Sequence, residues 1–162
     1  AEEAVRYHTI FWVAWEVAAQ PADTPWKELL DSPEPAVRFW TVHAMAWQAV
    51  CDGPTKVPLV IAALETVLAD NDPVVQIAAA WWLLKLGGGD AKPALDVLAR
   101  DMKSSDPNVR QQALVAIDSV GEASRPLWRA AAAVEVGKAH KADEYSRRMI
   151  ERIRARLESS PS

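Results

Sequence analysis

The chain has 162 residues, of which 50% are hydrophobic, and a formal net charge of −4 at pH 7. This length fits one domain with a real core, and the acidic balance argues against nucleic-acid binding, which needs a basic field to attract phosphates. We expect neither a membrane span nor a signal peptide, because no apolar run has the required length and flanks. The single cysteine, Cys51, excludes an internal disulfide and a thiolate metal cluster.

A short segment recurs along the sequence and defines its organisation. Its copies begin at Glu3, Pro35, Pro73, Pro107 and, more loosely, Glu144, at intervals of 32 to 38 residues. Repeats of this period are typical of stacked helix pairs. The abundance of Ala, Leu and Val agrees with an all-α protein.

The second helix of each pair is expected between these copies. In chain order, the partner helices are predicted at about residues 25–31, 56–69, 91–103 and 124–136, and a terminal helix rich in arginine and glutamate at about 143–157. Glu158 and the residues after it are expected to be disordered. Residues 1–158 are therefore predicted to form a single domain, and 159–162 a disordered tail.

The residues that begin and end these helices agree with the repeat. Asp72-Pro73 and Asp106-Pro107 each place a capping carboxylate before a proline, which is typical of a helix start. Gly121 follows a helix at the position where a left-handed residue closes the last turn.

Asp-Pro-x-Val-Arg at a helix start, small residues at its centre and Leu-Gly or Val-Gly at its end resemble the HEAT-repeat signature over nearly the whole chain. The resemblance implies a right-handed α-solenoid of about four helix pairs plus an N-terminal half repeat. Two other HEAT-like families fit less well. The histidines lack the adjacent glutamates that hold iron in deoxyhypusine hydroxylases, and alkylpurine DNA glycosylases need a basic groove.

A narrower resemblance concerns the runs Pro-Ala-Val-Arg-Phe-Trp, Val-Gln-Ile-Ala-Ala-Ala and Glu-Tyr-Ser-Arg-Arg. They are similar to the HEAT-repeat segment that follows the catalytic domain in some bacterial arylsulfatase-like proteins. The sulfatase motif Cys-x-Pro-x-Arg is absent, because after Cys51 the proline comes one residue late and the arginine is missing. The resemblance therefore implies an accessory scaffold without chemistry of its own.

Aligning the repeats on Val5, Val37, Val75 and Val109 converts the sequence into a surface map, because equivalent positions of a solenoid lie side by side. The aromatic residues concentrate in three columns of the first three repeats. The columns are His8, Trp40, Ala78 and Gln112; Phe11, His43, Trp81 and Val115; and Trp15, Trp47, Lys85 and Ser119.

These aromatic residues allow two interpretations. Taken singly, each ring is more typical of a core residue that fills space between helices than of a binding residue. Taken together, they predict a groove or pocket for an aromatic ligand or for an apolar side chain of a partner. The residues predicted to bind there are His8, Phe11, Trp15, Trp40, Trp47, Trp81 and Trp82.

His43 is the candidate catalytic residue. Desolvation among aromatic rings favours its neutral imidazole, a competent base or nucleophile. The alternative is a histidine bonded to a carbonyl or water at the groove edge. Glu16, Gln48 and Asp118 are candidates to orient a histidine, and no metal site or cofactor is expected.

Two functions follow from these observations. The first is a non-catalytic interaction module that binds a protein or peptide, or in its original setting the body of a sulfatase-like enzyme. The second is a binder of a small aromatic molecule or an artificial enzyme, installed by design or laboratory evolution on a HEAT scaffold, with His43 as base or nucleophile.

Two smaller expectations concern single residues and the last helix. Cys51 is expected to be a small buried hydrophobe. The arginines of the terminal helix, including Arg152 and Arg156, are expected to form a solvated face.

Overall fold

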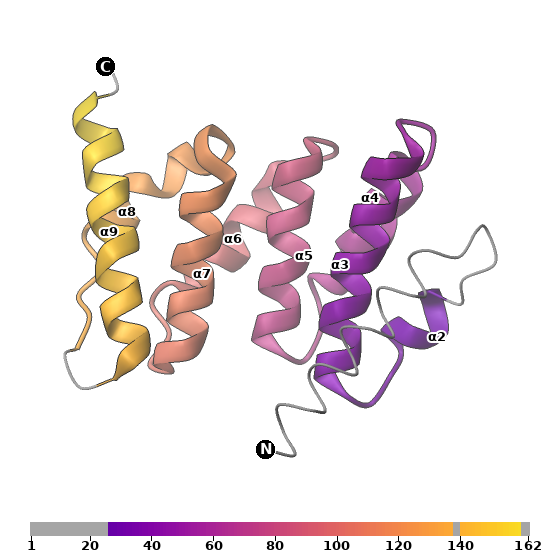
Figure 1. Cartoon of the computed structure of the whole chain (residues 1–162), viewed down its shortest axis with the longest axis horizontal. Coiled ribbons are helices and arrows are strands. Elements are labelled where there is room, and N and C mark those ends of the chain that lie inside the picture. Colours follow the sequence, from indigo (N-terminus) through magenta and orange to yellow (C-terminus); the bar gives the residue numbers. More distant parts are fainter. Residues whose placement is uncertain (1–25, 138–139, 160–162) are drawn as a thin grey trace.

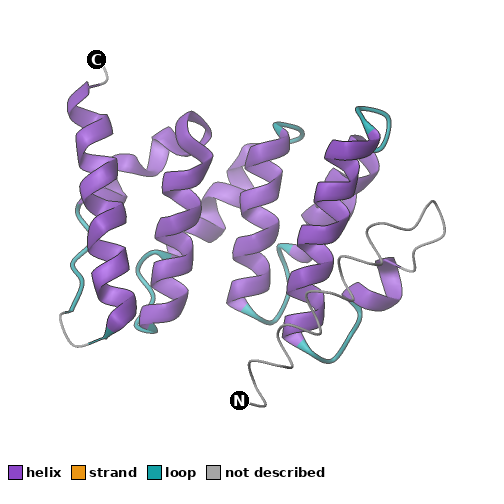
Figure 2. Cartoon of the chain, in the orientation of Figure 1, coloured by secondary structure: helices purple, strands orange, loops and turns teal. Residues whose placement is uncertain are grey.

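The computed structural model describes residues 26–137 and 140–159. Within these ranges the chain is all-helical and contains no strand (Figure 2). The predicted N-terminal half repeat, with His8, Phe11, Trp12 and Trp15, lies outside the described residues.

The helices follow one another with short connections. They are α2 (Trp26–Leu30), α3 (Pro35–Asp52), α4 (Val57–Val67), α5 (Pro73–Leu86), α6 (Ala91–Asp101), α7 (Pro107–Val120), the 3-10 helix η1 (Gly121–Leu127), α8 (Trp128–Ala132) and α9 (Lys141–Ser159).

Four of these helices stand side by side in chain order. Figure 1 shows α3, α5, α7 and α9 in one row, with α4, α6 and α8 in a second layer behind it. Each helix of the row packs against the next one. Residues that share a level on α3, α5 and α7 are therefore neighbours in space.

The predicted helix starts at Pro73 and Pro107 are confirmed. The Asp72 carboxylate accepts a hydrogen bond of 2.8 Å from the backbone N–H of Val74, and Asp106 accepts one of 2.8 Å from Asn108. These bonds satisfy amide groups that a helix start otherwise leaves without partners. Gly87 closes α5 in the left-handed conformation, at φ 69°, which only glycine adopts without steric cost. The same prediction is wrong for Gly121, which follows α7 with φ 64° and ψ −129°, outside the left-handed helical region.

The core is centred on α5, which is covered by its neighbours on both sides and from behind. Ala78, Ala79 and Ala80 are all buried there, and such small side chains allow neighbouring helices to approach closely. On α3, Thr41, Ala44 and Met45 are likewise buried.

One polar contact recurs in successive repeats. Arg38 donates to the carbonyl oxygen of Ser32 at 2.8 Å, Arg110 to that of Ser104 at 2.7 Å, and Gln76 to that of Asp70. In each case the acceptor lies six residues earlier, in the loop before the helix. The same position thus anchors α3, α5 and α7 to the loops that precede them.

Two of these side chains also reach the following repeat. The Arg38 guanidinium makes a bidentate pair with Asp70, at 2.7 and 2.8 Å. Arg110 contacts Asp143 at 2.5 Å, at the start of α9. These buried ion pairs connect neighbouring members of the row.

The predicted helix over 124–136 is wrong in its form. The segment is a 3-10 helix up to Leu127 followed by the short α8, and residues 133–137 are not helical. Pro126 cannot donate a backbone hydrogen bond. Ser124 is buried, and its hydroxyl donates to the carbonyl oxygen of Ile117 at 2.6 Å.

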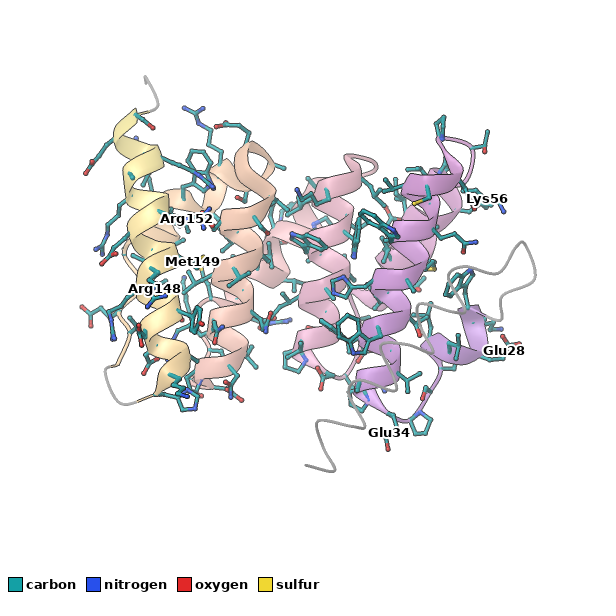
Figure 3. The ribbon with its side chains drawn as sticks, in the orientation of Figure 1. Glu28, Glu34, Lys56, Arg148, Met149 and Arg152 are labelled. Atoms are coloured by element: carbon teal, nitrogen blue, oxygen red, sulfur yellow. The ribbon has the colours of Figure 1, made fainter. Side chains whose placement is uncertain are left out.

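The last helix differs from its prediction in extent and in the role of its arginines. It begins at Lys141 and ends at Ser159, so Glu158 and Ser159 are helical rather than disordered, and 160–162 lie outside the described residues. Arg152, labelled on α9 in Figure 3, lies 3.2 Å from the buried carboxylate of Asp118, and Arg156 lies 3.0 Å from it. These arginines attach α9 to α7, so they are not simply a solvated face.

Candidate functional site

Aromatic side chains from α3 and α5 gather around His43, which is in the middle of α3. The His43 ring centroid lies 4.6 Å from that of Phe39, one turn earlier, and 5.8 Å from that of Trp40. From α5, Trp81 approaches to 5.6 Å and Trp82 to 6.0 Å. The structure therefore brings His43 and Trp81 together, as the repeat alignment predicted.

The two adjacent tryptophans of α5 bond to helices on opposite sides. The indole N–H of Trp82 donates to Nδ1 of His43 on α3 at 2.9 Å. That of Trp81 donates to the hydroxyl of Ser119 on α7 at 2.7 Å. Successive residues of a helix point about 100° apart, which explains how neighbours in sequence serve different helices.

The bond from Trp82 defines the tautomer of His43. An indole N–H is only a donor, so Nδ1 must be the acceptor and the proton of the neutral imidazole must sit on Nε2. Burial lowers the pKa of His43 from 6.5 to about 4, because the charged form loses its hydration. His43 is therefore a neutral side chain with an N–H donor on Nε2 at pH 7.

A pocket of about 260 Å³ opens beside this cluster and spans α3, α5 and α7. Its walls are mainly apolar, with His43, Gln112 and Ser119 as the polar members. The lining residues are Phe39, His43, Val74, Ile77, Ala78, Trp81, Gln112, Val115, Ala116 and Ser119. We call it the His43 pocket.

A second pocket of about 350 Å³ adjoins the first and is called the Trp40 pocket. The two share Phe39, Val74 and Gln112 as lining residues. Trp40 and the Asp72 carboxylate line the second pocket only. We call these two adjoining pockets together the aromatic groove.

A larger hollow of about 610 Å³ lies between α2, α3 and α4. Its lining includes Trp26, Met45 and Leu59, and none of the predicted site residues belongs to it. It shares no lining residue with the aromatic groove.

The predicted aromatic site residues that the structure describes are divided among four places. Trp81 lines the His43 pocket and Trp40 the neighbouring one. Trp82 is buried and holds His43 instead of lining either pocket. Trp47 is 49% exposed and lines neither. His8, Phe11 and Trp15 lie outside the described residues.

Sequence reasoning assigned no role to Phe39 and placed Gln112 in a column without assigning it to the site. Phe39 lies four residues before His43, on the same side of a helix, and this spacing is a signal that could have identified it. Gln112 shares the column of Trp40 and Ala78, so its contribution to the groove follows from the same alignment.

Two single-residue expectations need correction. Cys51 is exposed rather than buried, because it lies in the last turn of α3, where the row no longer covers that face. Asp118 does not orient His43, since its carboxylate is held by Arg152 and Arg156.

The lining of the aromatic groove is mainly apolar. In residues 26–137 and 140–159, no three His, Cys, Asp or Glu side chains gather as a metal site. Across the same ranges, no helix combines the length and apolar character that crossing a bilayer requires. The groove offers aromatic faces, aliphatic walls and a few hydrogen-bonding groups.

Comparisons with known proteins add no relative to this description. No protein-family model matches the chain, and searches of the curated proteins and of the solved structures find no significant match.

Proposed function

We propose that the chain is a non-catalytic HEAT-repeat scaffold, a right-handed α-solenoid segment that binds a protein or peptide through the aromatic groove. The row of α3, α5, α7 and α9 (Figure 1), the Asp-Pro helix starts and the recurrent contact from Arg38, Gln76 and Arg110 support the repeat assignment. In a sulfatase-like protein, which the sequence resembles, the partner would be the catalytic domain or a segment of it.

The observation that carries this proposal is that two pockets adjoin each other. The His43 and Trp40 pockets lie next to each other and share Phe39, Val74 and Gln112. Two adjoining apolar depressions suit alternate side chains of an extended polypeptide, which point to the same side and insert into separate pockets. A single compact ligand would use only one of them.

The hydrogen bond at His43 favours binding over catalysis. Nδ1 already accepts from Trp82, and Nε2 carries the proton, so neither nitrogen presents a lone pair to a substrate. The pKa of about 4 also makes this imidazole a weak base. These observations count against the artificial enzyme with His43 as base or nucleophile.

The test is a selection of displayed peptides on the full chain. Val115→Trp places a large ring in the His43 pocket, while Trp47→Ala removes an exposed indole that lines neither pocket. We expect selected peptides to bind the wild type and Trp47→Ala equally and to lose at least tenfold in affinity for Val115→Trp. Folding of each variant is checked by its circular dichroism.

Two outcomes would contradict the proposal. One is that no peptide is enriched over a selection without the protein. The other is that the enriched peptides bind a folded Val115→Trp as tightly as the wild type.

A further inference from the structure

We propose that the His43 pocket selects a tyrosine side chain of the bound peptide, with the phenol oxygen accepting a hydrogen bond from Nε2–H of His43. This inference rests on the proposed function and adds the chemistry of the bound side chain. It follows from the size of the pocket, its polar atoms and its charges, taken in turn.

The size of the pocket fits one aromatic ring with a substituent. A cavity of about 150 Å³ accommodates benzene, and ligand pockets of drug size begin at about 300 Å³. The His43 pocket, at about 260 Å³, lies between these values. Phe39 and Trp81 provide ring faces and edges against which another ring can pack.

The polar group that His43 presents in the pocket is a hydrogen-bond donor, so a bound side chain needs an acceptor to pair with it. His43 lines the pocket, and in the part of the chain that the structure describes its hydrogen bond is made through Nδ1, which leaves Nε2–H as a donor. Ser119 offers no second donor, because its hydroxyl donates to the carbonyl oxygen of Ala116 at 3.1 Å. Gln112, at the boundary of the two pockets, carries both kinds of group.

Among the large aromatic side chains, only tyrosine meets this requirement. Phenylalanine has no acceptor and would leave the Nε2–H donor desolvated without a partner. The only polar atom of tryptophan is an N–H donor, which cannot pair with a second donor. The tyrosine hydroxyl accepts a hydrogen bond while its ring fills the apolar part of the pocket.

The charges around the pocket disfavour ionic side chains. A carboxylate would lose its hydration beside an imidazole that is neutral at pH 7. A cation would meet the ammonium group of Lys85, which already lies 6.0 Å from the centre of the Trp81 ring. A neutral ring with an acceptor avoids both costs.

The experiment compares two peptides that differ by one oxygen atom. N-acetyl-Gly-Tyr-Gly-amide and N-acetyl-Gly-Phe-Gly-amide are titrated into the full chain at pH 7, with binding followed by NMR. One additional hydrogen bond is worth roughly threefold to tenfold in affinity, so we expect the tyrosine peptide to bind tighter by that factor. Free p-cresol is titrated in parallel and should bind more weakly than the tyrosine peptide.

Two variants locate the effect. His43→Phe removes the donor, and we expect the preference for tyrosine to fall to about onefold while both peptides still bind. His43→Gln restores a donor together with an acceptor for Trp82, and should recover part of the preference. Trp47→Ala, on the same helix but outside both pockets, should leave the preference unchanged.

The outcomes separate this inference from the proposed function. Equal binding of the two peptides, or a tyrosine preference that persists in a folded His43→Phe, overturns the tyrosine assignment and leaves the groove as a peptide site. Binding of p-cresol as tight as that of the tyrosine peptide overturns the assignment to a peptide side chain. If the wild type binds neither peptide, the result contradicts the proposed function itself.

Discussion

The indole N–H of Trp82 donates a hydrogen bond to Nδ1 of His43 across 2.9 Å, so a residue of α5 determines the tautomer of a residue of α3. Trp82→Phe removes this donor and leaves Nδ1 without its partner. We expect the His43 imidazole to change from a single Nε2–H tautomer to a mixture of both tautomers. The ¹⁵N chemical shifts of the ring nitrogens at pH 7 measure this change directly.

The same substitution should lower the free energy of unfolding by about 1–3 kcal/mol, because a buried acceptor is left unsatisfied and a smaller ring fills the site. Trp47→Phe is the matched control, since Trp47 is half exposed. If the ring nitrogens of His43 keep their shifts in Trp82→Phe, the hydrogen bond does not determine the tautomer.

A second prediction concerns pH, because burial lowers the pKa of His43 from 6.5 to about 4. Between these values the unfolded chain binds a proton at this residue and the folded chain does not. The stability that His43 contributes is therefore complete above pH 6.5, falls as the pH drops toward 4, and is constant below. Over this pH range the free energy of unfolding should decrease by about 3 kcal/mol because of His43.

His43→Gln isolates this effect, because all other titrating groups are common to both proteins. The difference in unfolding free energy between wild type and variant, measured in urea, should move in favour of the variant between pH 7 and pH 4.5. A difference that is independent of pH would show that the imidazole of the folded protein titrates like that of the unfolded chain.

Helix starts and the register of the repeats were predictable from the sequence, because both depend on local chemistry. An aspartate before a proline caps a helix wherever it occurs, which explains why the starts at Pro73 and Pro107 were correct. The alignment of repeats also placed His43 beside Trp81, since equivalent positions of stacked helices are neighbours.

Other features depend on the rotation of each helix about its own axis, which only packing determines. Trp81 and Trp82 were both predicted to bind in the groove, yet one lines a pocket and the other is buried. The contacts of Asp118 with Arg152 and Arg156 join residues far apart in the chain, and no local pattern indicates them. Pro126 was a local signal against a regular helix over 124–136.

Cys51 leads to a third prediction, because it is the one cysteine of the sequence and is exposed at the end of α3. We expect a thiol reagent to modify it stoichiometrically in the folded protein, without the delay that transient unfolding of a buried site would impose. The rate of modification by Ellman's reagent should change by less than about twofold when urea is added at concentrations below the unfolding transition. A rate that rises steeply with urea would indicate a buried thiol.

The fourth prediction concerns the ion pair between Arg38 and Asp70, whose side chains are 8% and 10% exposed. Burial alone would raise the pKa of Asp70, but the hydrogen bonds from Arg38 and from the Asp72 backbone outweigh it and lower that pKa. Arg38→Ala leaves this carboxylate buried without its partner, and we expect a loss of about 3–5 kcal/mol.

Arg38→Lys should restore only part of this stability, because an ammonium group cannot replace the bidentate contact and the bonds to Ser32 and Asn71 together. Both losses are measured by urea unfolding at pH 7. A loss below about 1 kcal/mol in Arg38→Ala, the range of exposed pairs, would show that the pair does not connect the repeats energetically.

The final prediction concerns the attachment of α9, where the two sides of the contact differ in exposure. The Asp118 side chain is 4% exposed, whereas Arg152 is 61% and Arg156 33% exposed. Asp118→Asn leaves two guanidinium groups that water can reach. Arg156→Met instead leaves a buried carboxylate with Arg152 alone, and it removes the bond of 2.5 Å to the Asp118 carbonyl oxygen.

Because an unpaired buried charge costs more than an exposed one, Arg156→Met should destabilise the protein by about 2–4 kcal/mol and Asp118→Asn by less. Hydrogen exchange of the α9 amides should show the same order, and the reverse order would mean that the arginines, rather than the carboxylate, bear the cost of burial.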